Sequence, residues 1–579
     1  MRNIPRRWIP AIIAIVLIAI ICVVAGLGYI RERYTPSTER ADLNELFQIT
    51  AEDEAAVIVD DLLTEEKAKI HEGEVYLSYS YVSSSLNKKV YIDERERLLL
   101  YALPDRVVQA AEGTALSDVT DLENTEGKTA PVWYEQDGTC YVSVTFVSHF
   151  TDQSFQFFEA PGRLYIDDSE GTRRQAQILE DTQVRRLGGI KSEIVTDVTA
   201  GAQVEILDSM DEWSQVRTEN GFIGYVRNDT LSGETVTEYT SDFVEPEYTS
   251  LTKDYDICLV WHQVFSSDDN NDLSSLLEEA RGVNTIAPTW FSLSDNEGNF
   301  TSLADTPYVE TAHERGLEVW GLIDNFNKDV STYEVLSRTS TRTALVENLT
   351  QAALDSGLDG INVDFESLTA DVGPHFVQFI RELSVACRQN GLVLSVDNYV
   401  PTSGTSFYDR AEQAAVADYV IVMGYDEHWS TSDAGSTASL PFVQSGIENT
   451  LLEVPQNKLI NAMPFYTRVW EFDAGVQVPS GEDPLAAQYV KSSTAVGMDR
   501  ARSLLEDGGA QLNWNSETGQ YYGEYDQDGS LYRIWLEDAT SLQAKLDLTA
   551  SYDLGGIAFW KLGLESSDVW PEIEAYMNR

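Results

Sequence analysis

Short apolar runs alternate with longer amphipathic stretches from about residue 254 to the end of the chain. Strand-length runs that alternate with helical spacers favour a parallel sheet, and eight of them indicate a (β/α)8 barrel over 253–579 rather than a doubly wound sheet. Between the seventh and eighth runs, QYYGEYDQDGSLYRIWLED predicts a hairpin inserted beside the cleft. The eight runs are DICLVWHQVF, VNTIAPTWFSL, GLEVWGLIDN, GINVDFESL, LVLSVDNYVP, YVIVMGYDEHW, KLINAMPFYTRVW and GGIAFWKLG.

The amino terminus predicts a membrane anchor. Residues 8–30 carry no charge, and about 20 apolar residues suffice to span the hydrocarbon core as a helix. Arginines in residues 1–7 favour a cytoplasmic tail there, with the rest of the chain outside the cell, in a Gram-positive bacterium. A cleaved signal peptide is the alternative, but its apolar region usually has only about 7–15 residues.

Polar and β-rich segments follow the anchor. We expect a stalk over 31–70 and a small β-rich domain over 71–170. Within that domain, GEVYLSYSYV (73–82) and GTCYVSVTFV (138–147) share the pattern Gly-x-x-Tyr-aliphatic-Ser-x-x-x-Val, which indicates an internal duplication. The pattern is similar to the amino-terminal domains labelled copper-amine-oxidase-like in bacterial wall enzymes, although two weak repeats predict no copper site.

Residues 180–235 alternate short β-rich runs with turns. Their W-x-x-V-R and G-x-x-G-Y-V strings, which begin at Trp213 and Gly221, resemble the bacterial SH3-like family. That resemblance implies wall contact, and a spacer whose aromatic residues only fill a small barrel is the alternative. We expect 236–252 to be a polar linker.

Composition excludes some functions. The chain has 95 acidic and 40 basic residues, a net charge of -55, so it lacks the basic footprint that nucleic acid requires. The histidines and cysteines show no metal-ligand spacing, and we expect neither a metal nor a cofactor.

The fourth run carries the candidate chemistry. In DGINVDFE, side chains alternate faces with period 2, so Asn362, Asp364 and Glu366 share one face of the strand. Two carboxyls and an amide inside a parallel barrel are costly to desolvate, a cost that is usually tolerated for catalysis. Asp364 should raise the pKa of Glu366 and keep a proton available near neutral pH.

This string resembles the D-G-x-D-x-D-x-E signature of glycoside hydrolase family 18. Three further motifs in the family's order support the resemblance: M-x-Y-D at 423–426, P-F-Y-x-R at 464–468, and a terminal Trp560. The resemblance implies retaining hydrolysis beside an N-acetylhexosamine, in which the sugar's own acetamide oxygen attacks the anomeric carbon.

The resemblance also implies residue roles. Glu366 would protonate the leaving oxygen and then activate water, Asp364 would stabilise the oxazolinium charge, and Tyr425 would bind the acetamide carbonyl. Asp359 and Gly360 would be structural within the motif. The chain departs from the family at Asn362, where many chitinases have Asp; an amide can bond Asp364 but cannot share its proton. The implied substrate-binding residues are Asn362, Met423, Asp426, Tyr466, Arg468, Trp560 and Trp290.

Six aromatic residues could either stack on sugars or pack in the core. They are Trp290, Phe291, Trp320, Tyr399, Trp429 and Trp535.

The sequences of the segments PTWF, GINVDFE and MGYDEHW are more similar to the spore-cortex and wall-lytic branch of the family than to secreted chitinases. With the anchor and the SH3-like module, it favours peptidoglycan as the substrate of a wall N-acetylglucosaminidase. A chitinase or an endo-β-N-acetylglucosaminidase acting on external glycans is one alternative, and a non-catalytic carbohydrate-binding surface protein is another. The presence of Glu366 argues against the second.

Overall fold

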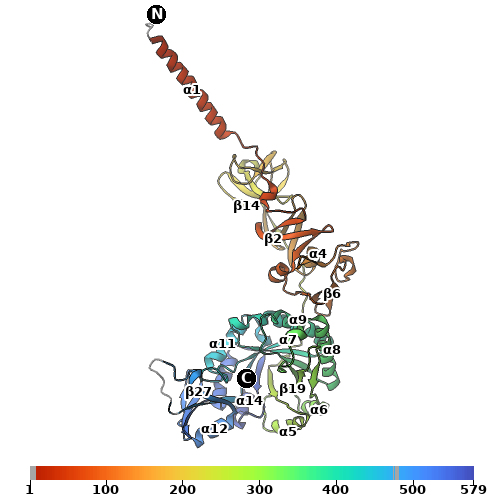
Figure 1. Ribbon diagram of the computed structural model, residues 1–579, viewed down its shortest axis with the longest axis vertical. Coiled ribbons are helices and arrows are strands. Elements are labelled where there is room, and N and C mark those ends of the chain that lie inside the picture. Colours follow the sequence, from red (N-terminus) through yellow and green to blue (C-terminus); the bar gives the residue numbers. More distant parts are fainter. Residues whose placement is uncertain (1–7, 474, 476–481) are drawn as a thin grey trace. The chain divides into compact units, whose positions relative to one another are not determined.

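The computed structural model describes residues 8–473, 475 and 482–579 (Figure 1). The proposed cytoplasmic tail, 1–7, lies outside the described residues. By its internal contacts the chain divides into two compact units, Met1–Val90 with Ala110–Glu245, and Tyr91–Gln109 with Pro246–Arg579.

The second unit contains a closed barrel of eight parallel strands, as predicted from the apolar runs. Strand order is β18-β31-β25-β24-β23-β22-β21-β19, and pairing of β18 with β19 closes the ring. The strands are β18 (Ile257–His262), β19 (Thr285–Leu293), β21 (Glu318–Asp324), β22 (Gly360–Asp364), β23 (Val393–Tyr399), β24 (Tyr419–Met423), β25 (Leu459–Pro464) and β31 (Gly556–Trp560). The short β20 (Phe300–Ser302) pairs antiparallel with β19.

Helices between the strands bury one face against the barrel. The longest are α8 (Thr339–Ser356) and α9 (Gly373–Asn390), which end at Gly357 and Gly391 with φ of 76° and 70°. Glycine adopts this left-handed conformation without a steric penalty, so both helices stop there. The others are α5 (Leu273–Leu276), α6 (Thr306–Glu314), α7 (Thr332–Leu336), α10 (Arg410–Val416), α11 (Leu440–Thr450), α13 (Ala539–Ala550) and α14 (Trp570–Met577).

An antiparallel sheet and a helix are inserted between β25 and β31. The sheet order is β27-β26-β30-β29-β28. The predicted hairpin is formed by β29 and β30, and its turn residues Asp528 and Gly529 both have positive φ, as a two-residue hairpin turn requires. The elements are β26 (Tyr466–Asp473), β27 (Val490–Gly497), α12 (Met498–Asp507), β28 (Asn513–Asn515), β29 (Gln520–Gln527) and β30 (Ser530–Leu536).

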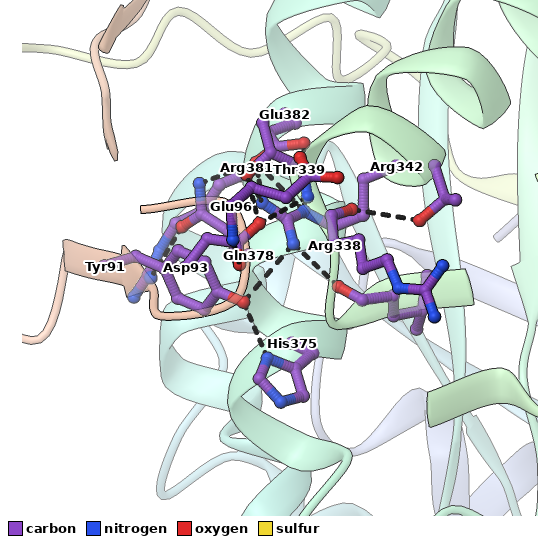
Figure 2. A network of polar contacts seen from close by, with 12 residues as sticks. Tyr91, Asp93, Glu96, Arg338, Thr339, Arg342, His375, Gln378, Arg381 and Glu382 are labelled. Atoms are coloured by element: carbon purple, nitrogen blue, oxygen red, sulfur yellow. Dashed lines mark hydrogen bonds and ion pairs between the residues drawn. The ribbon is translucent and has the colours of Figure 1, made fainter. Parts of the chain in front are cut away.

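Residues 91–109, which the sequence placed inside the small duplicated domain, pack with the barrel instead. They belong to a three-stranded sheet of β4 (Val90–Asp93), β5 (Leu98–Ala102) and β6 (Val107–Ala111). Figure 2 shows its contacts with α8 and α9, where the buried Arg342 guanidinium pairs with Glu382 at 3.0 Å and donates to the Tyr91 hydroxyl at 3.3 Å. The bond between Arg342 and Tyr91 joins residues 251 positions apart, and no local pattern encodes it.

The first unit begins with the apolar helix α1 (Ile9–Tyr34), which is long and apolar enough to cross a membrane. The stalk expected over 31–70 is corrected by the structure. Residues 54–71 form β1 (Glu54–Val59) and β2 (Leu62–His71), because the run AAVIV is buried in the sheet and pairs with β10. The segment before them bonds β13 of the SH3-like barrel, with Ala41 N donating to Ile194 O at 2.9 Å.

The seven-stranded sheet of this unit has the order β7-β8-β3-β2-β1-β10-β9. The two repeat strings lie side by side in it, because β3 and β8 pair antiparallel. In each repeat the shared serine, Ser78 or Ser143, ends a strand and caps the short helix that follows. Its further elements are α2 (Leu43–Leu46), β3 (Glu74–Ser78), α3 (Tyr79–Tyr81), β7 (Trp133–Gln136), β8 (Thr139–Ser143), α4 (Val144–His149), β9 (Gln153–Phe158) and β10 (Arg163–Asp168).

A second seven-stranded sheet holds the SH3-like region, in the order β13-β12-β16-β15-β14-β11-β17. The expected linker therefore begins as a strand, because β17 pairs with β11. Its strands are β11 (Gly171–Gln177), β12 (Thr182–Arg185), β13 (Ile194–Val198), β14 (Gln203–Ser209), β15 (Trp213–Thr218), β16 (Ile223–Arg227) and β17 (Thr235–Tyr239).

Candidate active site

Acidic side chains converge at the carboxyl ends of three adjacent barrel strands. Asp324 ends β21 and stands in register with Asp364, which ends β22. Glu366 lies two residues beyond β22, and Asp397 and Tyr399 lie near the end of β23. Because the strands are parallel, their carboxyl ends meet at one rim, which is where barrel enzymes carry out their chemistry.

Glu366 is held at both its backbone and its side chain. The Asn325 side chain accepts from Glu366 N at 2.9 Å and donates to Glu366 O at 2.9 Å. The Tyr399 hydroxyl donates to Glu366 Oε2 at 2.7 Å. The carboxyl stays partly exposed, so a substrate atom can reach a group whose position is fixed.

Burial controls the charge of Glu366. Desolvation raises the pKa of this carboxyl above its usual range, and the bond from Tyr399 opposes the rise. The charges of Asp426 and Asp324 raise it further. A carboxyl with a raised pKa and an accessible oxygen suits a proton donor near neutral pH.

Asp364 is buried, and its Oδ1 has no hydrogen-bond partner within the described chain. Burial raises the pKa of Asp364 well above its usual value, and the charges of Asp397, Glu366 and Asp324 add to the shift. An unpaired buried carboxylate oxygen is costly. The neutral, protonated form of Asp364 is therefore favoured.

Asn362 is fully buried and bonds its neighbours across the barrel interior. Its Nδ2 donates to Ser395 Oγ at 3.0 Å and to Asp397 Oδ1 at 2.9 Å, while its Oδ1 accepts from Trp261 Nε1 at 2.9 Å. Both hydrogens of the Asn362 side-chain amide are therefore donated to residues of β23. The structure thus corrects two expectations, because Asn362 neither bonds Asp364 nor reaches substrate.

The motif after the sixth strand forms a second polar group. Tyr466 donates to Asp426 Oδ1 at 2.6 Å, and Arg468 Nη2 lies 3.6 Å from the same oxygen. The half-buried Tyr425 ring meets the Tyr466 ring edge-on, with centroids 6.2 Å apart. The inserted strand β26 therefore holds Asp426 beside Tyr425. Burial raises the pKa of Tyr425, and the charge of Asp364 adds to the rise.

Four other motif residues occupy defined places. Met423 ends β24 and is buried, and Trp560 ends β31 half-buried, with its ring centroid 5.9 Å from that of Trp261. Asp359 bonds Val319 N and His313 Nε2, both at 2.8 Å. A side chain at Gly360 would meet Val393 O at 2.7 Å, so glycine is required there.

Trp290 is a correction. Its side chain is 1% exposed, its Nε1 donates to Asn270 Oδ1 at 2.9 Å, and its ring packs edge-on against Tyr308. A sugar ring cannot reach a face that lies in the core. Of the other candidate platforms, Phe291, Trp320 and Trp535 are also buried, Tyr399 bonds Glu366, and Trp429 is 53% exposed.

Sequence reasoning did not assign Asp324, Asn325 or Asp397. A signal for Asp397 was present, because Ser395, Asp397 and Tyr399 alternate along the fifth run as the motif residues do along the fourth. Asn325 gave no such signal, since it acts through the backbone of a residue 41 positions away.

Comparisons with known proteins agree with this geometry. Residues 223–565 match the model of glycosyl hydrolases family 18, and residues 181–232 match that of the bacterial SH3 domain. The uncharacterized glycosylase YvbX of Bacillus subtilis is 24% identical over 53% of this chain and 89% of its own length. A cortical fragment-lytic enzyme of Bacillus anthracis is 24% identical over 51% of this chain and 69% of its own length.

Among solved structures, the carboxyl-terminal domain of a Desulfitobacterium hafniense protein, described provisionally as a chitinase, superimposes with a TM-score of 0.50. It is 20% identical and covers 56% of this chain and 100% of its own. At this identity the likeness shows the fold.

Proposed function

Because the chain belongs to glycosyl hydrolase family 18 and is a glycoside hydrolase, we propose that it hydrolyses peptidoglycan outside the cell as an N-acetylglucosaminidase, by retaining, substrate-assisted chemistry. Glu366 donates a proton to the glycosidic oxygen. The sugar's acetamide oxygen attacks the anomeric carbon, and Asp364 stabilises the positive charge of the resulting oxazolinium. Glu366 then takes a proton from the water that opens the ring.

The observation that carries this proposal is the pairing of a reachable carboxyl with a buried one. Glu366 is partly exposed, fixed by Asn325 and Tyr399, and has a raised pKa. Asp364 lies two residues earlier, buried, and no partner within the described chain bonds its Oδ1. One carboxyl can exchange protons with substrate and water, while the buried one lies where it can stabilise developing positive charge.

Other side chains supply binding in this proposal. Tyr425 donates to the acetamide carbonyl, Trp560 forms the apolar floor under the reacting sugar, and Asp426 and Arg468 contact its hydroxyls. Tyr466 and Met423 hold these groups in place, as their burial supports.

Two observations support the wall as substrate. Relatives that match about half of this chain include cortical fragment-lytic enzymes, and a bacterial SH3 domain precedes the barrel. The helix α1 supports a single-pass anchor that keeps the barrel at the outer face of the membrane. A signal sequence can have the same length and apolar composition.

The test is product analysis by mass spectrometry. The full chain in detergent is incubated with purified peptidoglycan and, separately, with chitin oligosaccharides, with Glu366→Gln as the control. Muropeptides that end in reducing N-acetylglucosamine, absent with Glu366→Gln, are expected. Cleavage of chitin oligosaccharides alone would move the substrate to chitin-like glycans, and no cleavage by folded protein would contradict the proposal.

A further inference from the structure

A lysine without a counter-ion lies at the same rim of the barrel as the acidic side chains. Lys561 directly follows Trp560, the last residue of β31, and its side chain is half-buried. Burial lowers the pKa of the Lys561 ammonium group, and no acidic side chain in the described part of the chain pairs with it. Glu565, the acid nearest to it in sequence, accepts from Gly563 N at 2.7 Å instead. A partly buried cation without a counter-ion is unfavourable, so an anion that binds there is stabilised.

The neighbouring strand places an aromatic ring beside this ammonium group. β18 pairs with β31, and Phe265 follows β18 with its backbone fixed, because Asp269 Oδ2 accepts from Phe265 N at 2.8 Å. Phe265 is 75% exposed, and Lys561 Nζ lies 5.8 Å from the centroid of its ring. At an exposed site such a contact contributes only about 0.5–1 kcal/mol, which does not replace a counter-ion. Apolar surface and positive charge are therefore presented together at this rim.

The surroundings of Lys561 are otherwise acidic. Glu366, Asp364 and Asp324 gather at the same rim, and the chain as a whole has a net charge of -55. Arg468, a second cation near the site, lies 3.6 Å from Asp426 and is paired with it. Such a surface repels a glycan that carries carboxylates, unless a cation meets the anionic substituent where it lies. A neutral glycan has no such requirement.

We propose that Lys561 and Phe265 form a specificity site for glycans with an anionic substituent: Phe265 packs against the sugar next to the reacting one, and Lys561 Nζ binds a carboxylate on that sugar. This inference rests on the proposed function, in which Trp560 holds the reacting sugar beside Lys561. In a wall glycan, N-acetylmuramic acid supplies the carboxylate, either from its lactyl group or from the peptide attached to that group. Chitin has a hydroxyl at this place, so Lys561 distinguishes the two polymers.

The test measures binding to the full chain in detergent, with Glu366→Gln present throughout so that no ligand is cleaved. The ligands are chitotetraose and two tetrasaccharides of alternating N-acetylglucosamine and N-acetylmuramic acid, one with free lactyl carboxylates and one with stem peptides. Isothermal titration calorimetry gives each Kd. We expect Lys561→Met to lower the preference for an anionic over a neutral tetrasaccharide about tenfold, and Lys561→Arg to retain that preference within about threefold.

Two other lysines of the same unit are matched controls. Lys328 is exposed on the loop after β21, at the same rim, whereas Lys253 pairs with Glu318 at the amino end of β21. Lys328→Met and Lys253→Met remove the same charge and should change the preference less than about twofold, because an exposed or distant charge is screened. Thermal unfolding midpoints show that each variant is folded. A loss with the free lactyl ligand assigns the carboxylate to the lactyl group, and a loss confined to the other anionic ligand assigns it to the peptide.

An unchanged preference in Lys561→Met, or an equal loss in Lys328→Met, would contradict the proposal. Binding and cleavage fail separately, because the binding measurement uses protein that cannot cleave. If the preference depends on Lys561 but the original chain leaves peptidoglycan intact, the proposed function is wrong and the anion site remains. If peptidoglycan is cleaved and the preference does not depend on Lys561, only this inference is wrong.

Discussion

At the scale of single residues, the site depends on which carboxyl oxygens are held and which are left unpaired. Glu366 Oε2 accepts from Tyr399 at 2.7 Å, whereas Asp364 Oδ1 has no partner in the described part of the chain. Hydrogen bonds to a charged carboxylate lower its pKa, and burial without them raises it. Two acids two residues apart are thereby suited to different roles.

Replacing Tyr399 with Phe removes the one hydrogen bond that opposes the raised pKa of Glu366. We expect that pKa to rise further, because a hydrogen bond to the charged carboxylate lowers its pKa and its loss removes that effect. Glu366 must be protonated to act as an acid, so the alkaline limb of kcat/KM should move to higher pH, measured from pH 4 to pH 9.

Tyr408→Phe is the matched control for that experiment. The Tyr408 hydroxyl donates to Phe365 O at 3.2 Å and does not bond Glu366. Its loss should cost about 1 kcal/mol of stability without moving the alkaline limb. A limb that stays in place in Tyr399→Phe would show that the bond does not set the Glu366 pKa.

Two tryptophans should respond in opposite ways to replacement by alanine. Trp290 is buried in the core, so Trp290→Ala should lower the free energy of unfolding by about 3–5 kcal/mol, and activity should follow the folded fraction. Half-buried Trp560 ends β31, so Trp560→Ala should mainly raise KM or lower kcat while the protein stays folded. Urea unfolding and kinetics on the same samples distinguish a loss of stability from a loss of substrate binding. A folded Trp290→Ala with a raised KM would show that Trp290 binds substrate after all.

At the scale of elements, the sequence predicted those strands and helices that show a local hydrophobic periodicity. Apolar alternation located all eight barrel strands, and the period-2 alternation of the fourth run placed Asp364 and Glu366 at the rim. The same reasoning could not find the role of Asn325, nor show that residues 54–71 are strands of a sheet. Asn325 bonds a residue 41 positions away, and β1 pairs with the distant β10 as well as with the adjacent β2. Local periodicity is silent on such distant partners.

The amino end of α8 is the clearest such case. Its N-cap residue, Arg338, makes no side-chain capping bond. Instead Asp93 accepts from Thr339 N at 2.6 Å and Glu96 accepts from Ser340 N at 2.8 Å, both from the 91–109 segment (Figure 2). Free N–H groups at a helix start are stabilised by acidic partners wherever these lie in the sequence.

Asp93→Ala should therefore destabilise the barrel unit by about 0.5–2 kcal/mol, the usual cost of losing a helix cap. Asp105→Ala is the control, because Asp105 pairs with Arg106 in the exposed turn of the same segment, and such pairs contribute about 0–1 kcal/mol. Thermal unfolding followed by tryptophan fluorescence measures both. Equal midpoints in the two variants would mean that the remote cap does not stabilise α8.

At the scale of the whole molecule, the functional unit is not a continuous stretch of chain. The barrel begins in sequence near residue 246, but residues 91–109 are part of the same compact unit. Besides capping α8, the segment accepts a bond at the Tyr91 hydroxyl from the buried Arg342 at 3.3 Å, and Arg388 Nε donates to Pro104 O at 2.9 Å. A boundary drawn from apolar runs alone cuts this unit in two.

A fragment of residues 246–579 should accordingly be less stable than the barrel in the longer chain, by about 2–4 kcal/mol from the lost caps and hydrogen bonds. Adding a synthetic peptide of residues 90–111 should raise its unfolding midpoint increasingly as the logarithm of peptide concentration rises above its Kd, because a ligand that binds only the folded state stabilises it. A peptide with Asp93 and Glu96 replaced by Ala should raise it much less. If 246–579 unfolds at the same midpoint with and without peptide, and at the midpoint of the longer chain, residues 91–109 do not stabilise the barrel.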